Sequence, residues 1–178
     1  PQGLVAGENA PNFSGIDQYG NEVELNAVLN DKMAVLIFYR GYWCPVCSRY
    51  LSNFADSAAI LEEAGAKVIA VTPETAENVK KTTKQTGIEF SVISDKDLEI
   101  ATAYDLDFAV TDAYSKLIAD NLGADIAATN GSTDARLPIP AVFIIQKDGI
   151  IAADFFDYDY RKRVTPGKLL NILKKYNR

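Results

Sequence analysis

A continuous apolar run over residues 33–39, followed directly by a helix-like pattern, constrains the fold more than any other feature of this sequence. A strand that is apolar at every position is buried on both faces, and such strands occur where helices cover both sides of a sheet. Apolar residues then recur at helical spacing from 45 to 64. Pro45 suits the first turn of this helix, because no amide donor is needed there. The pattern predicts a strand–helix unit of an α/β sheet.

The same alternation continues along the chain and predicts a mixed sheet with helices on both faces. A small N-terminal hairpin is expected over 13–16 and 23–25, and later strands over 68–71, 90–93, 141–146 and 150–155. Helices are expected over 45–64, 72–87, 95–104 and 108–122, with a long loop over 124–137. A last helix begins near Thr165 and should turn Leu169, Leu173 and Tyr176 inward.

Length and charge limit the possible organisation and partners. The 178 residues are expected to form a single domain, 1–178, because this length is typical of one core. The 24 acidic against 18 basic residues give a net charge of −6, which argues against nucleic acid as a partner. No stretch approaches the roughly 20 apolar residues of a bilayer span. We therefore expect no membrane association. We also expect a cytoplasmic location, with the periplasm as the alternative because a CxxC pair can also work in an oxidising space.

The two most informative residue counts are those of histidine and cysteine. The chain has no histidine, which excludes Ser-His-Asp and Cys-His catalysis and histidine-ligated zinc. It has only two cysteines, Cys44 and Cys47. Two cysteines do not make a secreted disulfide framework, and they supply half of the ligands that a structural zinc site needs. We therefore expect neither a metal nor an organic cofactor.

Cys44 and Cys47 lie where the buried strand ends and the helix begins. Reactive groups gather at such strand ends, and the free amides and dipole of a helix N-terminus stabilise a thiolate. The spacing also allows the two sulfurs to form a bond with little backbone motion. The alternative is an inert disulfide or a pair of merely buried thiols, but so short a disulfide loop removes little chain entropy. The position therefore favours a redox-active pair.

A lowered thiol pKa cannot by itself make a fast peroxidase. Lowering the pKa from about 8.5 to about 7 raises the thiolate fraction about sixteen-fold at neutral pH. Nucleophilicity falls together with the pKa, and this loss reduces the gain by roughly five-fold, so attack becomes only about three-fold faster. A peroxidase also needs donors that polarise the O–O bond as it breaks.

Several segments resemble one family. Residues 38–47, FYRGYWCPVC, are similar to the active-site segment of thioredoxin-like redoxins, and most of all to the peroxiredoxin-like alkyl hydroperoxide reductase/thiol-specific antioxidant group. The likeness extends over nearly the whole chain, through segments 10–13, 20–23, 137–141, 143–145 and 159–161. It implies a thioredoxin-like fold with a cis Pro140 beside the cysteines. It also implies that the Ile139 backbone can pair with an extended substrate peptide.

The resemblance also implies supporting residues. Cys47 matches the peroxidatic cysteine of peroxiredoxins, and Cys44 then replaces their assisting threonine. Arg40 and Arg136 are the candidates for the assisting arginine, although a surface role is slightly favoured for both.

The aromatic residues Tyr39, Tyr42 and Trp43 could shape a substrate platform, but packing in the core is the more frequent role. The basic run 161–163 is read as a surface that flanks the last helix.

Three functions remain open at this point. In the first, Cys47 attacks a hydroperoxide, Cys44 closes the disulfide, and a thioredoxin-like or other dithiol protein reduces it, giving an antioxidant peroxidase. In the second, Cys44 attacks a substrate disulfide and Cys47 resolves the mixed disulfide; Cys44 should then be the more exposed sulfur. In the third, the pair is a non-enzymatic redox sensor. A homodimer is a possible assembly.

Overall fold

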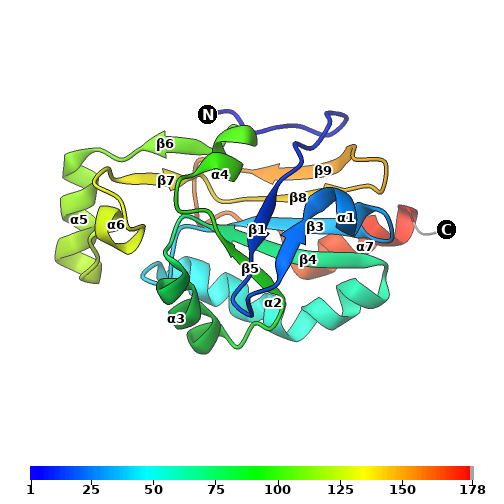
Figure 1. Cartoon of the computed structure of the whole chain (residues 1–178), viewed down its shortest axis with the longest axis horizontal. Helices are drawn as coiled ribbons and strands as arrows, with labels where there is room; N and C mark the ends of the chain where they lie inside the picture. Colours follow the sequence, from blue (N-terminus) through cyan, green and yellow to red (C-terminus); the bar gives the residue numbers. More distant parts are fainter. Residues whose placement is uncertain (177–178) are drawn as a thin grey trace.

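The computed structural model describes residues 1–176, along which nine strands and seven helices are placed (Figure 1). The strands are β1 (Ser14–Ile16), β2 (Glu22–Glu24), β3 (Met33–Phe38), β4 (Ala66–Thr72), β5 (Ser91–Ser94), β6 (Asp107–Ala109), β7 (Arg136–Pro138), β8 (Ala141–Ile145) and β9 (Ile151–Phe156). The helices are α1 (Leu25–Leu29), α2 (Pro45–Glu63), α3 (Ala76–Thr86), α4 (Glu99–Ala103), α5 (Asp112–Leu122), α6 (Ile126–Thr129) and α7 (Pro166–Tyr176).

A five-stranded sheet in the order β5-β4-β3-β8-β9 forms the centre of the molecule. β4 runs parallel to β3 and β5, whereas β8 is antiparallel to β3 and β9 is antiparallel to β8. The sheet is therefore mixed, as the sequence predicted. Among the described residues, no helix is long and apolar enough to cross a membrane.

The apolar run of β3 divides the core into two layers. Every residue of this central strand is buried. Val35 and Ile37 point to the side of α2 and α7, where they pack with Leu51, Phe54 and other apolar side chains. Their neighbours Leu36 and Phe38 point to the other side, against the hairpin, α1 and α4. This two-sided burial confirms the interpretation of residues 33–39 and places the end of β3 deep in the molecule.

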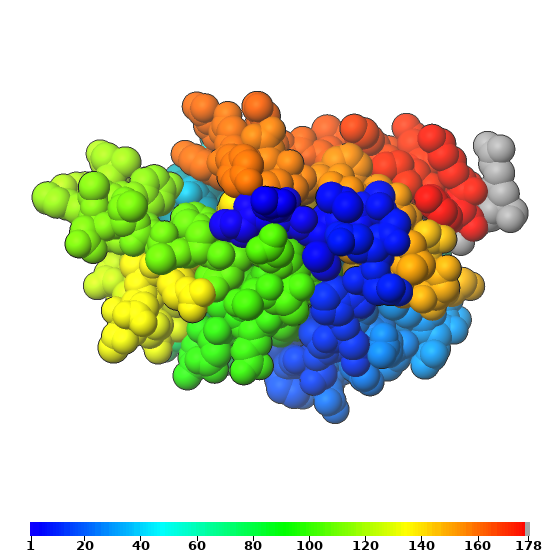
Figure 2. All heavy atoms as spheres, turned by 90° about the horizontal axis from the view of Figure 1, so that it is seen from above, coloured from blue at the N-terminus to red at the C-terminus, as the bar shows by residue number. Residues whose placement is uncertain are grey.

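The predicted N-terminal hairpin is confirmed as the antiparallel pair β1–β2. It packs over β5 at Gly15, where an added Cβ would lie 2.4 Å from the Ile93 side chain. Residues 1–10 form an arm along the other edge of the sheet, where the Gly7 N–H donates to the carbonyl of Ile151 at 2.9 Å. Figure 2 shows this arm, in dark blue, against the orange segment that follows β9.

Two expectations between residues 108 and 137 are wrong. The helix predicted over 108–122 begins only at Asp112, because the Thr111 hydroxyl accepts the Tyr114 N–H and caps it there. Phe108 instead belongs to β6 and pairs with Leu137 of β7. The loop predicted over 124–137 therefore contains this strand and the short helix α6. Pairing between distant segments overrides the local helical pattern at Phe108.

Three other predicted helices differ from those in the structure at particular residues. α3 begins at Ala76 rather than near Thr72, because Thr75 is the residue that caps it. α4 begins at Glu99, with the Asp95 carboxylate accepting the N–H groups of Ile100 and Ala101. Leu169 and Leu173 face inward on α7 as predicted, but Tyr176 is 45% exposed.

The contact between Gly15 and Ile93 gives a stability test. We expect Gly15→Ala to lower the free energy of unfolding by about 1–3 kcal/mol, because the new methyl group displaces a buried side chain. The matched control is Gly167→Ala in α7, where a Cβ would meet nothing within 4 Å. This second change should raise stability by about 0.4–1 kcal/mol. Urea denaturation measures both, and equal effects would contradict the close packing at Gly15.

Candidate active site: a dithiol between two arginines

Cys44 and Cys47 lie at the N-terminus of α2, directly after the central strand. Cys44 is the N-cap, Pro45 is the first helical residue, and the Cys47 N–H donates to Cys44 Sγ at 3.3 Å. Both thiols are free, and neither side chain exposes any surface to solvent. The prediction of a dithiol at a strand end and helix start is confirmed. The expectation that Cys44 is the more exposed sulfur is wrong, because side chains from other elements cover both.

Arg40 covers the Cys44 sulfur. It follows β3 directly, and its Nη2 donates to Cys44 Sγ at 3.3 Å while its Nη1 donates to the Tyr114 hydroxyl at 2.6 Å. The guanidinium carbon lies 3.9 Å from the ring centre of Tyr160 and 5.1 Å from that of Trp43. Only 5% of Arg40 is exposed. A cation this deeply buried is stabilised by a nearby negative charge, which the thiolate of the pair supplies.

Arg163 lies on the other sulfur. Its Nη2 donates to Cys47 Sγ at 3.6 Å, and its guanidinium stacks on the ring of Tyr50 at 5.1 Å. Arg163 belongs to residues 157–165, which connect β9 to α7 and which we call the strap. The expectation of a surface role holds for Arg161 and Lys162, which form exposed ion pairs with Asp159 and Asp157. It is wrong for Arg163, and nothing in the local run 161–163 distinguishes this arginine.

The two thiols ionise as one unit because their sulfurs interact directly. Burial raises the pKa of Cys47, but the hydrogen bond with Cys44 and the charges of Arg163 and Arg40 outweigh it and lower that pKa to about 5. The hydrogen bond with Cys47, burial and the charge on Cys47 raise the pKa of Cys44, although Arg40 opposes them. The reduced pair therefore carries a single negative charge at neutral pH.

Hydrogen-bond donors and pKa directions point to different sulfurs as the holder of this charge. Cys44 Sγ accepts the Cys47 N–H and Arg40 at 3.3 Å each, whereas the contact of Arg163 with Cys47 Sγ is longer, at 3.6 Å. The contacts thus favour a thiolate at Cys44, and the lowered pKa favours one at Cys47. Movement of one proton between neighbouring sulfurs interconverts the two forms. The single charge of the pair is what the arrangement establishes, and both sulfurs can act as nucleophiles.

Only some of the other predicted site residues lie against the dithiol. Tyr39 and Trp43 are buried in the core cluster that also contains the cysteines, so packing is their main role. Arg136 lies on β7 and pairs with Asp107, not with a sulfur. Of the two candidate assisting arginines, Arg40 is therefore the one that the fold brings to the dithiol.

The expectations for Ile139 and Pro140 are wrong in two respects. The described chain contains no cis peptide bond, so Pro140 follows a trans bond. Trans is the ordinary state of an X–Pro bond, and only the resemblance favoured cis. The Ile139 N–H already donates to the Leu106 carbonyl at 2.8 Å and is not free for a substrate peptide. Both residues nevertheless line a cavity beside Arg40.

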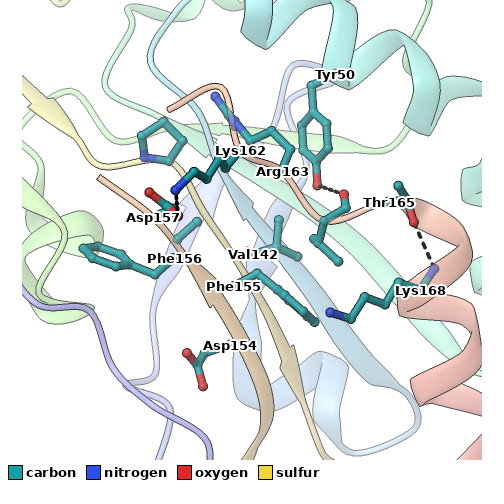
Figure 3. Close-up of a pocket in the computed structure, with 13 residues that line it drawn as sticks. Tyr50, Val142, Asp154, Phe155, Phe156, Asp157, Lys162, Arg163, Thr165 and Lys168 are labelled. Carbon is teal, nitrogen blue, oxygen red and sulfur yellow. Dashed lines mark hydrogen bonds and ion pairs between the residues drawn. The ribbon is translucent and has the colours of Figure 1, made fainter. Parts of the chain in front are cut away.

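Two cavities of about 400 Å³ each have Pro140 in their lining and border the two arginines that contact the sulfurs, although neither is lined by a cysteine. The Cys44-side cavity borders Arg40 and is mostly apolar, with further lining from Tyr114, Tyr160, Phe108, Val110 and Ile139. The Cys47-side cavity borders Arg163 and is lined by more charged groups, including Lys162 and Lys168 (Figure 3). In this second cavity Lys168 Nζ lies 5.0 Å from the ring centre of Phe155.

Sequence reasoning also missed Glu74, which was expected only to lie near the start of a helix. The Glu74 side chain is completely buried behind the segment that leads to Cys44. Its Oε1 accepts the Tyr42 N–H at 2.7 Å, and its Oε2 accepts the Thr82 hydroxyl at 3.1 Å. A lone glutamate after an apolar strand gives no signal of burial, because most glutamates in such positions are exposed.

Sequence comparison finds curated relatives over part of the chain. A putative peroxiredoxin of Mycobacterium tuberculosis is 30% identical over 101 residues, which is 57% of this chain and 64% of that protein. The thiol-disulfide oxidoreductase ResA of Bacillus subtilis is 30% identical over 106 residues, or 59% of this chain and 58% of that protein. The chain thus spans less than two thirds of the length of each of these curated relatives.

Structure and family comparisons extend the likeness to the fold and to most of the chain. The crystal structure of the peroxidoxin BcpB from Mycobacterium tuberculosis superposes with a TM-score of 0.75 at 17% identity and covers 97% of both chains. This confirms the predicted thioredoxin-like fold. The AhpC/TSA family model matches residues 6–154, which include both cysteines, Arg40 and Glu74. The dithiol at the end of β3 is thus part of a peroxiredoxin-like domain, and the chain belongs to the AhpC/TSA family.

Proposed function

We propose that the chain is a thiol-dependent peroxidase that reduces hydroperoxides through Cys44 and Cys47. The observation that carries this proposal is the placement of one arginine on each sulfur, at 3.3 and 3.6 Å. The family's assisting threonine is replaced by Cys44, so other donors must stabilise the charge that develops on the breaking O–O bond. Two guanidinium groups beside the sulfurs, that of the buried Arg40 and that of the half-buried Arg163, are suited to that task.

The proposed cycle uses both sulfurs once. The Cys47 thiolate attacks the terminal oxygen of a hydroperoxide, the O–O bond breaks, and the alkoxide leaves and takes a proton to become an alcohol. Cys47 is then a sulfenic acid. The Cys44 sulfur attacks Cys47, an S–S bond forms, and the hydroxyl leaves with the Cys44 proton as water. A dithiol protein of the thioredoxin type then supplies two electrons and two protons to restore both thiols.

Disulfide exchange with Cys44 as nucleophile is the second candidate. The observation that favours it is that Cys44 Sγ accepts two hydrogen-bond donors and therefore also suits a thiolate. The likeness to the thiol-disulfide oxidoreductase ResA also supports disulfide exchange. The two candidates use the same disulfide and differ in which sulfur attacks first.

Both candidates require the strap to move, because neither sulfur is exposed. The strap contributes Tyr160 to the stack on Arg40 and Arg163 to the contact with Cys47. Its own ion pairs, Asp157–Lys162 and Asp159–Arg161, lie at the surface, where such pairs add little stability. We infer that the strap opens locally and admits the substrate through one of the two cavities.

The cellular role follows from the proposed chemistry. A reactive dithiol in a chain with no other cysteine suits a reducing compartment, which supports a proposed location in the cytoplasm. There it would act as an antioxidant, with a hydroperoxide as substrate and a dithiol protein as reductant.

Single cysteine variants test the order of attack. We expect Cys44→Ser treated with peroxide to be labelled by a dione probe for sulfenic acid, because Cys47 is oxidised and has no partner. Cys47→Ser should be labelled little, and the double variant not at all. Labelling of Cys47→Ser alone would favour disulfide exchange by Cys44. Peroxide consumption that stops after one equivalent, despite an added dithiol reductant, would instead indicate a sensor.

The contact of Arg163 with Cys47 predicts a pH effect. The ultraviolet absorbance of the thiolate should persist as the pH falls and disappear around pH 5, where the pair takes up its proton. Arg163→Met should move this midpoint upward by about one unit or more, because an opposite charge favours the ionised form. The matched control is Arg161→Met, which alters an exposed strap arginine paired with Asp159. Equal midpoints in the two variants would rule out the proposed role of Arg163.

The stack of Tyr160 on Arg40 predicts an effect on access. Tyr160→Ala should speed alkylation of the reduced protein by iodoacetamide about tenfold, since a desolvated cation–π contact contributes on the order of 1–2 kcal/mol to the closed strap. Tyr158→Ala is the control, because that exposed ring makes an edge-on contact with Phe156 instead. If both variants react at the wild-type rate, the strap does not control access.

A further inference from the structure

Glu74 is a buried acid beside the dithiol that the proposed cycle does not use. It exposes no surface, and the hydrogen bonds to its carboxylate come from neutral groups: the Tyr42 amide and the hydroxyls of Thr72 and Thr82. Burying a carboxylate with only neutral donors is costly, because such donors offset just part of the lost hydration. A glutamine could accept the Tyr42 N–H with its one oxygen and donate its amide N–H to a threonine hydroxyl, without that cost. The presence of an ionisable group at this buried position therefore calls for a functional explanation.

The contacts of Glu74 lead directly to Cys44. Its Oε1 holds the Tyr42 N–H at 2.7 Å, and the Cys44 N–H closes the same turn on the Gly41 carbonyl at 3.1 Å. The turn is tightly packed, because a Cβ on Gly41 would lie 2.4 Å from Trp43 Nε1 and 3.0 Å from Glu74 Oε1. Trp43 in turn stacks on Arg40, the arginine that donates to Cys44 Sγ.

We propose that Glu74 is a positioning residue of the dithiol, which fixes the turn over residues 41–44 and makes the reactivity of the sulfurs depend on its own charge. This inference rests on the proposed redox function of the pair. Glu74 acts through the Tyr42 amide and through its electric field, and it touches neither sulfur.

The electrostatic surroundings of Glu74 make this dependence measurable. Burial raises the pKa of Glu74 to about 7; the Tyr42 amide, the Thr82 hydroxyl and Tyr39 oppose the rise, and the charge on Cys47 adds to it. The titratable groups that face it are thus Tyr39 at the end of β3 and Cys47 on α2. On α3, Lys81 lies over the Tyr42 ring at 4.8 Å. Glu74 therefore gains its charge at a higher pH than the dithiol, whose first ionisation lies near pH 5.

An ionised Glu74 affects the thiolate in a defined direction. A second negative charge nearby makes the thiolate more basic, and nucleophilicity increases with basicity by about threefold for each pKa unit. The rate of alkylation should therefore rise in two steps, first near pH 5 with the pair and again near pH 7 with Glu74. A carboxyl with a purely structural role would leave the second step absent.

The experiment is a pH profile of iodoacetamide alkylation of the reduced full chain. Glu74→Gln keeps an acceptor for the Tyr42 N–H and lacks the charge, so it should retain the first step and lose the second. Thr82→Val removes a donor from Glu74 and should move the second step to higher pH. The matched control is Asp17→Asn, which alters a buried carboxylate that accepts two backbone amides and the Ser91 hydroxyl away from the dithiol. Its profile should equal that of the wild type.

The outcomes separate this inference from the proposed function, because alkylation needs no peroxide. A second step that survives in Glu74→Gln, or that is absent from the wild type, overturns the role of Glu74. If Glu74→Gln fails to fold, a second step in Thr82→Val that stays at the wild-type pH has the same consequence. Absence of peroxide turnover together with a two-step alkylation profile would overturn the proposed peroxidase function and would still support the positioning role of Glu74.

Discussion

A single negative charge on two buried sulfurs is held in place by two guanidinium groups and a helix N-terminus. The thiolate and the buried guanidinium of Arg40 would each be unfavourable alone in the interior, because an isolated buried ion loses its hydration. Together they compensate one another: Arg40 and Arg163 lie against the sulfurs, and the first turn of α2 supplies the Cys47 amide. Arg40 and the cysteines follow β3 directly and therefore lie at one end of the sheet, where the strap covers them.

The cluster is assembled from segments that are far apart in the chain. Arg40 and Cys44 are neighbours in sequence, but Arg163 lies 116 residues beyond Cys47. Tyr114 on α5 and Tyr160 on the strap complete the surroundings of Arg40. Oxidation of the pair to a disulfide would remove the charge that both arginines face. The strap contributes Arg163 and stacks Tyr160 on Arg40. It would then lose part of the electrostatic attraction that holds it over the sulfurs.

The sequence was sufficient for those parts of the site that depend on local pattern. The apolar run of β3, the helical spacing after Pro45 and the position of Cys44 and Cys47 between them are all local signals. They predicted the fold and the dithiol correctly. Phe108 shows the limit of such reasoning, because its pairing with Leu137 depends on a segment that the local pattern does not include. The same holds for Arg163 and Glu74, whose burial results from tertiary packing. Pro140 is different: there the resemblance suggested a cis bond, and the ordinary trans preference prevails.

The coverage of the sheet edges has a consequence for assembly. The N-terminal arm bonds to β9 at Ile151, and at the opposite edge Asp17 forms a bridge to Ile93 of β5. An uncovered edge would present unpaired backbone groups to a second molecule. Here the backbone at Ile151 and at Ile93 is already paired within the chain. A second copy that continued the sheet would therefore have to pair along the edge strands away from these two residues.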